Sequence, residues 1–308
     1  MVLVFAVTIT VTATLLFGAF LHPSTIGLYA TLPYYLYILL WNRPERNEGA
    51  RWIAFSKNFI LFRIIREFLS LKLVVSDKLK VREAQPKAQF VFAVFPHGSN
   101  SDYRIVLDGL LADALPNVYS SIRVLAASVL FRIPVVRELA LWTGCVDASR
   151  SVAEKLLSRG RSLLVLPGGQ AEQMRTIHGR EILYLKKRKG FVKLAMKHGV
   201  PVVPVYAFGA SDYYRTSLFA HDFRLWILKA LGIALPFAVG LYGSLICPLP
   251  VPTTVVMGDP IVFAVKTEGV PTPEEVDDAH EQFCLALSAL FDKHKTQLGY
   301  GSRMLEIQ

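Results

Sequence analysis

The first 42 residues contain no Asp, Glu, Lys or Arg. That absence excludes a solvated N-terminal arm. The 308-residue chain as a whole is apolar, with 53% hydrophobic residues and a mean hydropathy of +0.39, and the apolar excess lies mainly in this N-terminal segment. Residues 2–21 reach the roughly 20 apolar positions that span a bilayer core. Residues 25–41 predict a second, slightly short span with aromatic residues toward its end.

The breaker His22-Pro-Ser-Thr25 lies between these runs and suits a tight hairpin. A cleaved signal peptide is the alternative, but its positive n-region is missing and the apolar stretch is too long. We therefore expect a membrane anchor of one or two transmembrane helices over residues 1–42 and a catalytic domain over residues 43–308. Arginines at 43, 46 and 51 predict that this domain faces the cytosol.

Cysteine is also scarce. The three cysteines, Cys145, Cys247 and Cys284, show neither pairing nor metal-ligand spacing, which agrees with a reducing compartment. The chain has no Gly-x-Ser-x-Gly elbow, Gly-x4-Gly-Lys-Ser/Thr loop, Gly-x-Gly-x-x-Gly fingerprint or His-Glu-x-x-His motif. We expect no bound metal and no resident cofactor.

The formal net charge is +10, yet no zinc-finger spacing, RNA-binding signature or basic helical array accompanies it. The charge therefore favours anionic lipid headgroups and negatively charged substrates as partners, and not nucleic acid.

Strand-like and helix-like segments alternate along the chain, which predicts an α/β fold with a mostly parallel sheet and flanking helices. The expected strands are residues 72–81, 90–95, 122–127, 162–166, 202–208 and 254–257. The expected helices are residues 51–71, 103–115, 149–158, 191–198 and a last one to residue 295, with Thr272 as N-cap and Pro273 at N1. Residues 223–247 are apolar but broken by glycine and proline, which suits a membrane interface or a lipid-facing groove better than a span.

One apolar strand, residues 90–95, leads to a single histidine, His97, between a proline and a glycine. Four residues separate it from Asp102. A histidine where a strand of an α/β sheet ends can take a proton from a hydroxyl near neutral pH, so a general base is the first hypothesis. The alternative is a capping box with Ser99 as N-cap and Asp102 at N3, which would make His97 an ordinary turn residue.

A second strand leads into Pro167-Gly168-Gly169, followed by Glu172 at a helix start. The glycines let the backbone approach a ligand, and their N–H groups can bind an oxyanion or a phosphate. A plain strand-to-helix turn is the alternative. Since no protein nucleophile or metal motif is evident, the nucleophile would come from the substrate.

Together these motifs resemble the type-2 diacylglycerol acyltransferase family, which includes monoacylglycerol acyltransferases and wax synthases. The blocks in register are Pro96-His-Gly98, Pro167-Gly-Gly169 with Glu172, and residues 188–199, 203–209, 258–261, 271–276 and 290–295. Phe95 stands where the family usually has the first histidine of His-Pro-His-Gly, and Phe68-Leu-Ser70 where Tyr-Phe-Pro is expected. Asp102 restores the His-x4-Asp pattern of the wider glycerolipid acyltransferases.

The resemblance implies an O-acyltransferase of the endoplasmic reticulum membrane or lipid droplets, with acyl-CoA as co-substrate and diacylglycerol as acceptor. His97 would deprotonate the acceptor hydroxyl, and Asp102 or Glu172 would orient its imidazole. Backbone N–H groups near Gly98 or Gly168 and Gly169 would hold the oxyanion, beside Pro96. Candidates for the CoA phosphates are Arg137, Lys187, Arg188 and Lys189, for each of which a solvated surface role is the alternative.

Other readings stay open at this point. Monoacylglycerol, a fatty alcohol or a lysophospholipid could serve as acceptor. A membrane-bound hydrolase that activates water is a second enzyme class, and a lipid-droplet membrane-shaping or anchoring protein is a non-enzymatic one. A homo-oligomer is a further possibility.

Overall fold

The computed structural model describes residues 32–231, 234–264 and 270–308. The first expected membrane span lies outside these residues. The described part of the second forms α2 (Leu32–Leu36) and a π turn (Tyr37–Trp41). Among the described helices, none is long and apolar enough to cross a bilayer.

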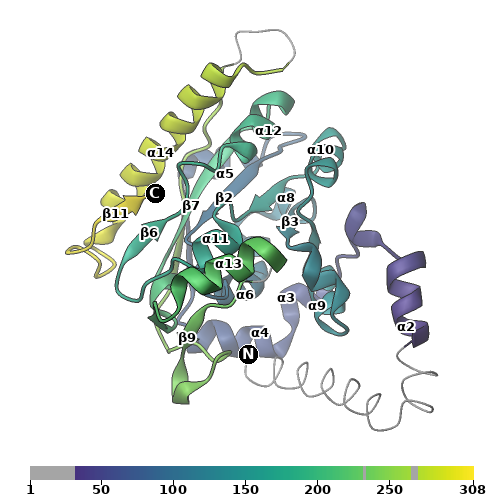
Figure 1. Cartoon of the computed structure of the whole chain (residues 1–308). Coiled ribbons are helices and arrows are strands. Elements are labelled where there is room, and N and C mark those ends of the chain that lie inside the picture. The colour runs from purple at the N-terminus through teal and green to yellow at the C-terminus, as the bar shows by residue number, and fades with distance from the viewer. Residues whose placement is uncertain (1–31, 232–233, 265–269) are drawn as a thin grey trace.

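A seven-stranded sheet forms the centre of the fold (Figure 1). Its strands in spatial order are β1 (Lys72–Val75), β10 (Thr254–Met257), β7 (Val202–Phe208), β2 (Val91–Phe95), β5 (Leu163–Val165), β3 (Arg123–Ala126) and β4 (Cys145–Asp147). Strands β10 and β7 pair antiparallel, and the other neighbours pair parallel. The predicted α/β fold with a mostly parallel sheet is confirmed.

Helices cover both faces of this sheet, because side chains of successive strand residues point to opposite faces. In β2, Phe92 and Val94 belong to one apolar cluster, and Val91, Ala93 and Phe95 to the other. Helices packed on the first cluster include α3 (Ile53–Asn58), α4 (Ile60–Phe68), α6 (Asp102–Val106), α7 (Asp108–Ala114), α8 (Pro116–Tyr119) and α9 (Val136–Trp142). The second is covered by α10 (Arg150–Ser158), α12 (Gly190–His198) and α14 (Pro273–Lys295).

Smaller elements complete the chain. They are α5 (Asp77–Glu83), α11 (Gly169–Gln173), α13 (His221–Leu231), the parallel pair β6 (Glu181–Leu183) and β11 (Leu305–Ile307), and the antiparallel pair β8 (Arg215–Ser217) and β9 (Phe237–Val239). Short 3-10 turns occupy Pro44–Arg46, Ser128–Arg132, Ala210–Asp212 and Leu241–Gly243.

Local capping explains where the elements differ from expectation. The strand expected over residues 72–81 ends at Val75, because the Ser76 hydroxyl accepts a bond from Leu79 N (3.2 Å) and starts α5. The helix expected over residues 51–71 divides at the extended Phe59. By contrast, α14 begins as predicted, with Thr272 in a capping box.

Strands β2 and β7 are neighbours in the sheet. The next sheet strand after β2 is β3, on one side of this pair, and the next after β7 is β10, on the other side, so the chain leaves the pair in opposite directions. Such a switch point leaves a crevice at the carboxyl ends of the strands, where ligands bind in open α/β sheets. His97 follows β2 at this end.

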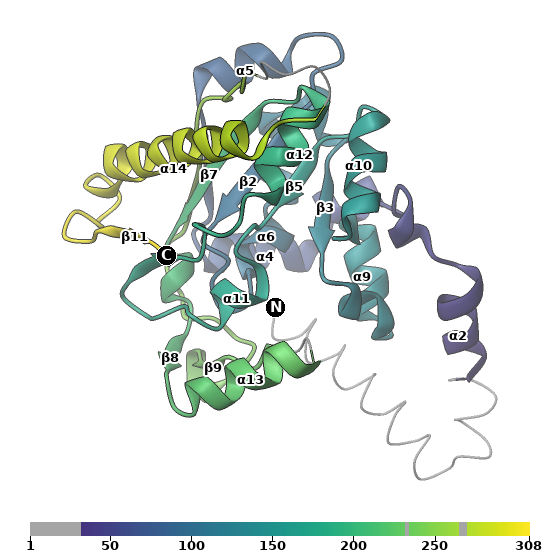
Figure 2. The ribbon, with the colours of Figure 1, turned by 45° about the horizontal axis from the view of Figure 1, so that its top comes forward.

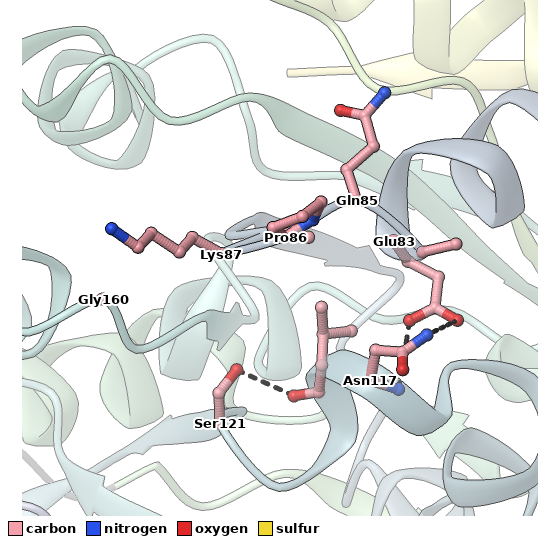
Figure 3. Close-up of a pocket in the computed structure, with 10 residues that line it drawn as sticks. Glu83, Gln85, Pro86, Lys87, Asn117, Ser121 and Gly160 are labelled. Carbon is pink, nitrogen blue, oxygen red and sulfur yellow. Dashed lines mark hydrogen bonds between the residues drawn. The ribbon is translucent and has the colours of Figure 1, made fainter.

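The cavity in Figure 3, about 350 Å³, is lined by Glu83, Lys87, Ser121 and Gly160, which come from segments before β2, β3 and β5. It therefore lies at the amino end, away from His97.

Candidate active site

The turn that carries His97 is fixed on both sides. Tyr103, buried in α6, donates its hydroxyl to the carbonyl oxygen of Pro96 (2.9 Å). Gly98 has a φ of +64°, and a Cβ there would lie 3.0 Å from the carbonyl oxygen of Ala210. The turn after β2 thus packs tightly against the turn after β7, and only glycine fits without strain.

Hydrogen bonds to the imidazole of His97 define its tautomer. The Ser101 hydroxyl donates to the backbone carbonyl of His97 (2.7 Å), so toward Nδ1, 3.1 Å away, its oxygen acts as an acceptor. The Gly98 carbonyl, also 3.1 Å from Nδ1, can only accept. Nδ1 therefore carries the proton, and Nε2 has a lone pair that no residue of the described chain engages. Burial lowers the pKa of His97 below its ordinary value, which keeps the ring neutral at pH 7.

Glu172 in α11 is fully buried and clamps the backbone beside this histidine. One carboxylate oxygen accepts the backbone N–H of His97, and the other accepts that of Tyr184 (2.9 Å). Burial raises the pKa of Glu172 to about 7, although these two bonds and the charge of Arg188 oppose the shift. The carboxylate thus ties the turn after β2 to the segment after β6.

Asp102 begins α6 and is only 3% exposed. Its Oδ2 and the buried hydroxyl of Tyr214 make no hydrogen bond of normal geometry, but they lie close enough for the hydroxyl to favour the charged carboxylate and lower the pKa of Asp102 in part. Burial raises the pKa of Asp102 to about 7. The alternative interpretation, a capping box with Ser99 as N-cap, is wrong: the N-cap is Ser101, in a left-handed conformation (φ +54°).

Neither carboxylate bonds the imidazole ring, contrary to the expectation that Asp102 or Glu172 orients it directly. Glu172 holds the backbone of His97, while Ser101 and Gly98 hold the ring. Ser101 was missed because nothing in a serine four residues after a histidine marks it as a ring acceptor. The left-handed Ser101 conformation that brings it there is a property of the tertiary turn.

Some of the backbone N–H groups in the two glycine-containing turns at this end of the sheet donate hydrogen bonds within the protein, and others do not. The Gly169 N–H bonds the carbonyl of Leu166 (3.1 Å). Those of Gly98 and Gly168 bond no acceptor among the residues that the structure describes. The predicted oxyanion donors therefore reduce to Gly98 and Gly168.

Comparisons with known proteins give matches along most of the chain. Residues 20–308 match the family model described as Diacylglycerol acyltransferase. The chain belongs to the diacylglycerol acyltransferase family. It is 32% identical to Diacylglycerol O-acyltransferase 2 of Xenopus tropicalis, over 88% of this chain and 77% of that one, and 31% identical to the Homo sapiens protein of that name, over 88% and 72%. It is also 32% identical to 2-acylglycerol O-acyltransferase 3 of Homo sapiens, over 84% and 78%.

Among solved structures, the chain resembles the 1-acyl-sn-glycerophosphate acyltransferase PlsC of Thermotoga maritima. The match covers 94% of this chain and 93% of that chain at 17% identity, with a TM-score of 0.46. This likeness is weak.

Phe95, where this family member departs from His-Pro-His-Gly, is completely buried. Its ring lies 6.1 Å from that of Phe283 on α14, in the apolar cluster on the face of the sheet that α12 and α14 cover. A phenylalanine needs no hydrogen-bond partner there, so the departure is accommodated by the core.

The basic residues expected to meet CoA lie in different surroundings. Arg137 is buried and donates to the Asn42 carbonyl (2.7 Å) and to Glu138 (2.7 Å). These bonds and its burial fit neither a CoA phosphate ligand nor the alternative, a solvated surface residue. Lys189 pairs with Asp277 on α14 (2.6 Å). Lys187 is exposed to solvent.

Arg188 is the member of this set whose charge acts on Glu172. Its guanidinium lies 5.0 Å from the ring centroid of Tyr184, against which Arg175 also stacks at 4.5 Å. Its charge opposes the rise in the pKa of Glu172. The sequence did not single out Arg175 or Tyr184, because stacking partners carry no motif of their own. No group of His, Cys, Asp or Glu suited to a metal ion occurs among the described residues.

The Asp102→Asn variant is expected to retain acyl transfer to within about tenfold, since Asp102 does not bond the imidazole and a catalytic carboxylate would cost far more. The free energy of unfolding of the variant should rise relative to that of the parent protein as pH rises. Because burial raises the folded-state pKa of Asp102 to about 7, the parent loses stability between about pH 4 and pH 7, where the unfolded chain releases a proton that the folded protein still holds.

Thermal unfolding in detergent across this pH range measures the effect. The stability difference between variant and parent should grow by up to about 1.4 kcal/mol per pH unit inside the window and stay constant above it. A loss of activity by a factor of about 10³ or more would instead make Asp102 a partner of the imidazole.

Proposed function

We propose that the protein transfers a fatty acyl group from acyl-CoA to the free hydroxyl of diacylglycerol, forming triacylglycerol and CoA, with His97 as general base. The free lone pair of His97 Nε2, at the switch point of the sheet, carries this assignment. Family membership and the relatives named Diacylglycerol O-acyltransferase 2 support the reaction class and the acceptor.

In the proposed reaction, Nε2 takes the proton of the acceptor hydroxyl as its oxygen attacks the thioester carbonyl. The tetrahedral oxyanion accepts bonds from the free N–H groups of Gly98 and Gly168, each typically worth about 3 kcal/mol. Collapse expels the CoA thiolate, which leaves without much acid help because thiols have a low pKa. The proton held on Nε2 then passes to the thiolate or to solvent.

The surroundings of His97 suit a ring that becomes positively charged for part of the cycle. Its Nδ1–H already faces two acceptors, the Gly98 carbonyl and the Ser101 hydroxyl. The buried Glu172 lies one peptide group away and holds the backbone in place. Glu172 is therefore a positioning residue in this proposal, and no resident cofactor takes part.

Lys187 and Arg188 are the remaining candidates for the CoA phosphates, since Arg137 and Lys189 are engaged within the protein. Arg188 extends from the segment that Glu172 ties to His97, so an anion bound there would lie beside the reaction centre.

We further propose that residues 1–42 anchor the protein in the endoplasmic reticulum membrane, with the catalytic domain facing the cytosol. The uncharged N-terminal sequence and the arginines that follow it support this orientation. Lipid droplets are a second location that a hairpin anchor permits.

Membranes that contain the full chain, given labelled acyl-CoA with diacylglycerol, 2-monoacylglycerol, fatty alcohol or lysophosphatidate in parallel, test the acceptor. We expect labelled triacylglycerol as the main product. The second candidate is acylation of 2-monoacylglycerol, which the similarity to 2-acylglycerol O-acyltransferase 3 favours. Acylation of lysophosphatidate without triacylglycerol formation would overturn the assignment, and release of free fatty acid alone would indicate a hydrolase.

A further inference from the structure

Between β7 and β10 the chain makes an excursion that takes no part in the central sheet. We call its described residues, 215–231 and 234–245, the 215–245 lobe; it contains β8, α13, β9 and the 3-10 turn Leu241–Gly243. In Figure 2, α13, β8 and β9 lie together at one end of the molecule, and α5 lies at the opposite end.

A buried arginine holds this lobe together. Arg224, only 4% exposed, donates to the carbonyl oxygens of Ser217 (2.9 Å), Phe219 (2.9 Å) and Leu235 (3.1 Å), which join β8 and α13 to the segment before β9. Its guanidinium also lies 5.2 Å from the centre of the Phe237 ring. Arg224 therefore ties β8, the start of α13 and the segment before β9 into one unit.

That outer surface is apolar. Two ring pairs lie on it, Phe219 with Phe237 at 6.0 Å and Phe223 with Trp226 at 5.9 Å. The large apolar side chains exposed on the lobe are Leu218, Phe219, Phe223, Trp226, Leu235, Phe237, Val239, Tyr242 and Leu245. Nine large exposed apolar side chains within one small lobe indicate a place that something covers.

The charge pattern favours lipid as the cover. Residues 230–258 contain no Asp, Glu, Lys or Arg. Two exposed cations, Arg215 in β8 and Lys229 in the last turn of α13, are opposed by the single acid Asp222 in this lobe. Basic residues on or near a helix that exposes Trp and Phe are typical of segments lying in the interface of a membrane with anionic lipids.

The lobe is also tied to the catalytic turn. Asn100, three residues after His97, donates its side-chain amide to the carbonyl of Leu245 (3.4 Å). On the other side, Thr216 in β8 accepts the backbone N–H of His178, in the loop that follows α11 (3.0 Å). A membrane in contact with the lobe would therefore lie close to the end of the sheet that carries His97.

We propose that the 215–245 lobe inserts its exposed apolar side chains into the bilayer interface, as a membrane contact separate from residues 1–42. This contact would place the active site next to the lipid, so that the acceptor enters it from the membrane. The second part of this proposal rests on the proposed function, and the first does not.

Fluorescence of the full-length protein in vesicles of phosphatidylcholine with an anionic phospholipid tests the contact. In a Cys284→Ser background, which leaves the buried Cys145 and Cys247, an environment-sensitive thiol probe is attached at Phe223→Cys or, as a matched control, at Val81→Cys on α5. The parent side chains are 61% and 68% exposed, respectively. We expect nitroxide-labelled lipids to quench the probe at 223 and to leave the probe at 81 unchanged.

Equal and negligible lipid quenching at both positions, in protein that floats with the vesicles, would overturn the proposal. So would a probe at 223 that is shielded from aqueous iodide but not quenched by lipid, because a second copy of the chain would then cover the lobe. The measurement uses no substrate, so its outcome does not depend on the proposed reaction.

A kinetic arm tests the link to the acceptor. The Phe223→Asp, Trp226→Asp double variant should raise the KM for long-chain diacylglycerol in vesicles by about tenfold or more, through loss of apolar contact with lipid. Its kcat for a short-chain diacylglycerol dispersed in detergent should not change, and Val81→Asp should change neither quantity. If triacylglycerol formation is absent in the parent protein, the proposed function fails while the quenching result stands. An unchanged KM in the double variant would refute the entrance role.

Discussion

His97→Ala is expected to lower the rate of acyl transfer by about 10²- to 10⁴-fold, the usual contribution of a positioned general base. The variant removes Nε2, the proton acceptor whose lone pair no residue of the described structure engages. Because His97 lies in a turn held by its backbone, through Glu172 and Ser101, the fold should persist without the ring. Turnover of labelled acyl-CoA measures the loss, and an unchanged unfolding temperature and vesicle flotation control for folding and anchoring.

Ser101→Ala is the matched control for this variant. It removes one of the two acceptors of Nδ1–H but keeps the Gly98 carbonyl, so the tautomer with a free Nε2 is retained. The variant also loses the bond that the Ser101 hydroxyl donates to the His97 carbonyl. We expect a decrease of about thirtyfold or less, since each of the two neutral hydrogen bonds contributes roughly 1 kcal/mol. Activity of His97→Ala close to that of the parent would remove His97 from the reaction altogether.

Glu172→Gln is expected to lower kcat by about 10- to 100-fold. The parent carboxylate accepts two backbone N–H groups, from His97 and Tyr184. A glutamine amide accepts at one end only and turns an NH₂ toward the other N–H, and a buried unsatisfied donor costs about 1–3 kcal/mol. The turn that carries His97, the proposed base, is then no longer held in place.

Gly168→Ala should act in the same direction without touching the carboxylate itself. A Cβ at position 168 would lie 2.2 Å from Oε2 of Glu172, which forces that side chain to move. Gly190→Ala is the matched control, because a Cβ there meets no atom within 4 Å. Parent-like kcat in both Glu172→Gln and Gly168→Ala would show that the clamp does not position His97.

The pH dependence adds a second readout for the same clamp. Burial raises the pKa of Glu172 to about 7, so its charge costs stability as pH rises from about 4.5 to 7. Activity should move in the opposite direction, because the ionised form is the one that accepts both N–H groups. We expect an acid limb near pH 7 in the kcat profile of the parent and its absence in Glu172→Gln, where the lower pKa of His97 becomes limiting. An identical limb in both proteins would assign it to another group.

The elements predicted best are those whose signals are local. The strands Val202–Phe208 and Thr254–Met257 and the start of α14 at Pro273 occur where the sequence predicts them, because runs of apolar residues and a Thr-Pro cap act within a few residues. Strand β4 (Cys145–Asp147) was missed, since three residues carry no period and its place depends on pairing with β3.

In the candidate site, too, the local features could be predicted from the sequence and the long-range contacts could not. His97, Gly98, Gly168 and Glu172 stood out because a lone histidine, glycines and an acid at strand ends are visible in a single sequence. The partners of each group were not visible. That Glu172 bonds a backbone N–H 75 positions away, and that Arg137 is buried against Asn42, follow from which turns the sheet order brings together.

The sequence by itself determined the uncharged N-terminal segment, the α/β alternation, the histidine at the end of a strand and the resemblance to an acyltransferase family, since each depends on residue type and short spacing. Only the tertiary structure decided which nitrogen of His97 is free, that Asp102 does not bond its ring, and that the lobe held by Arg224 presents its aromatic residues outward. These depend on contacts between segments far apart in the chain, and their geometry is set by packing of the whole domain.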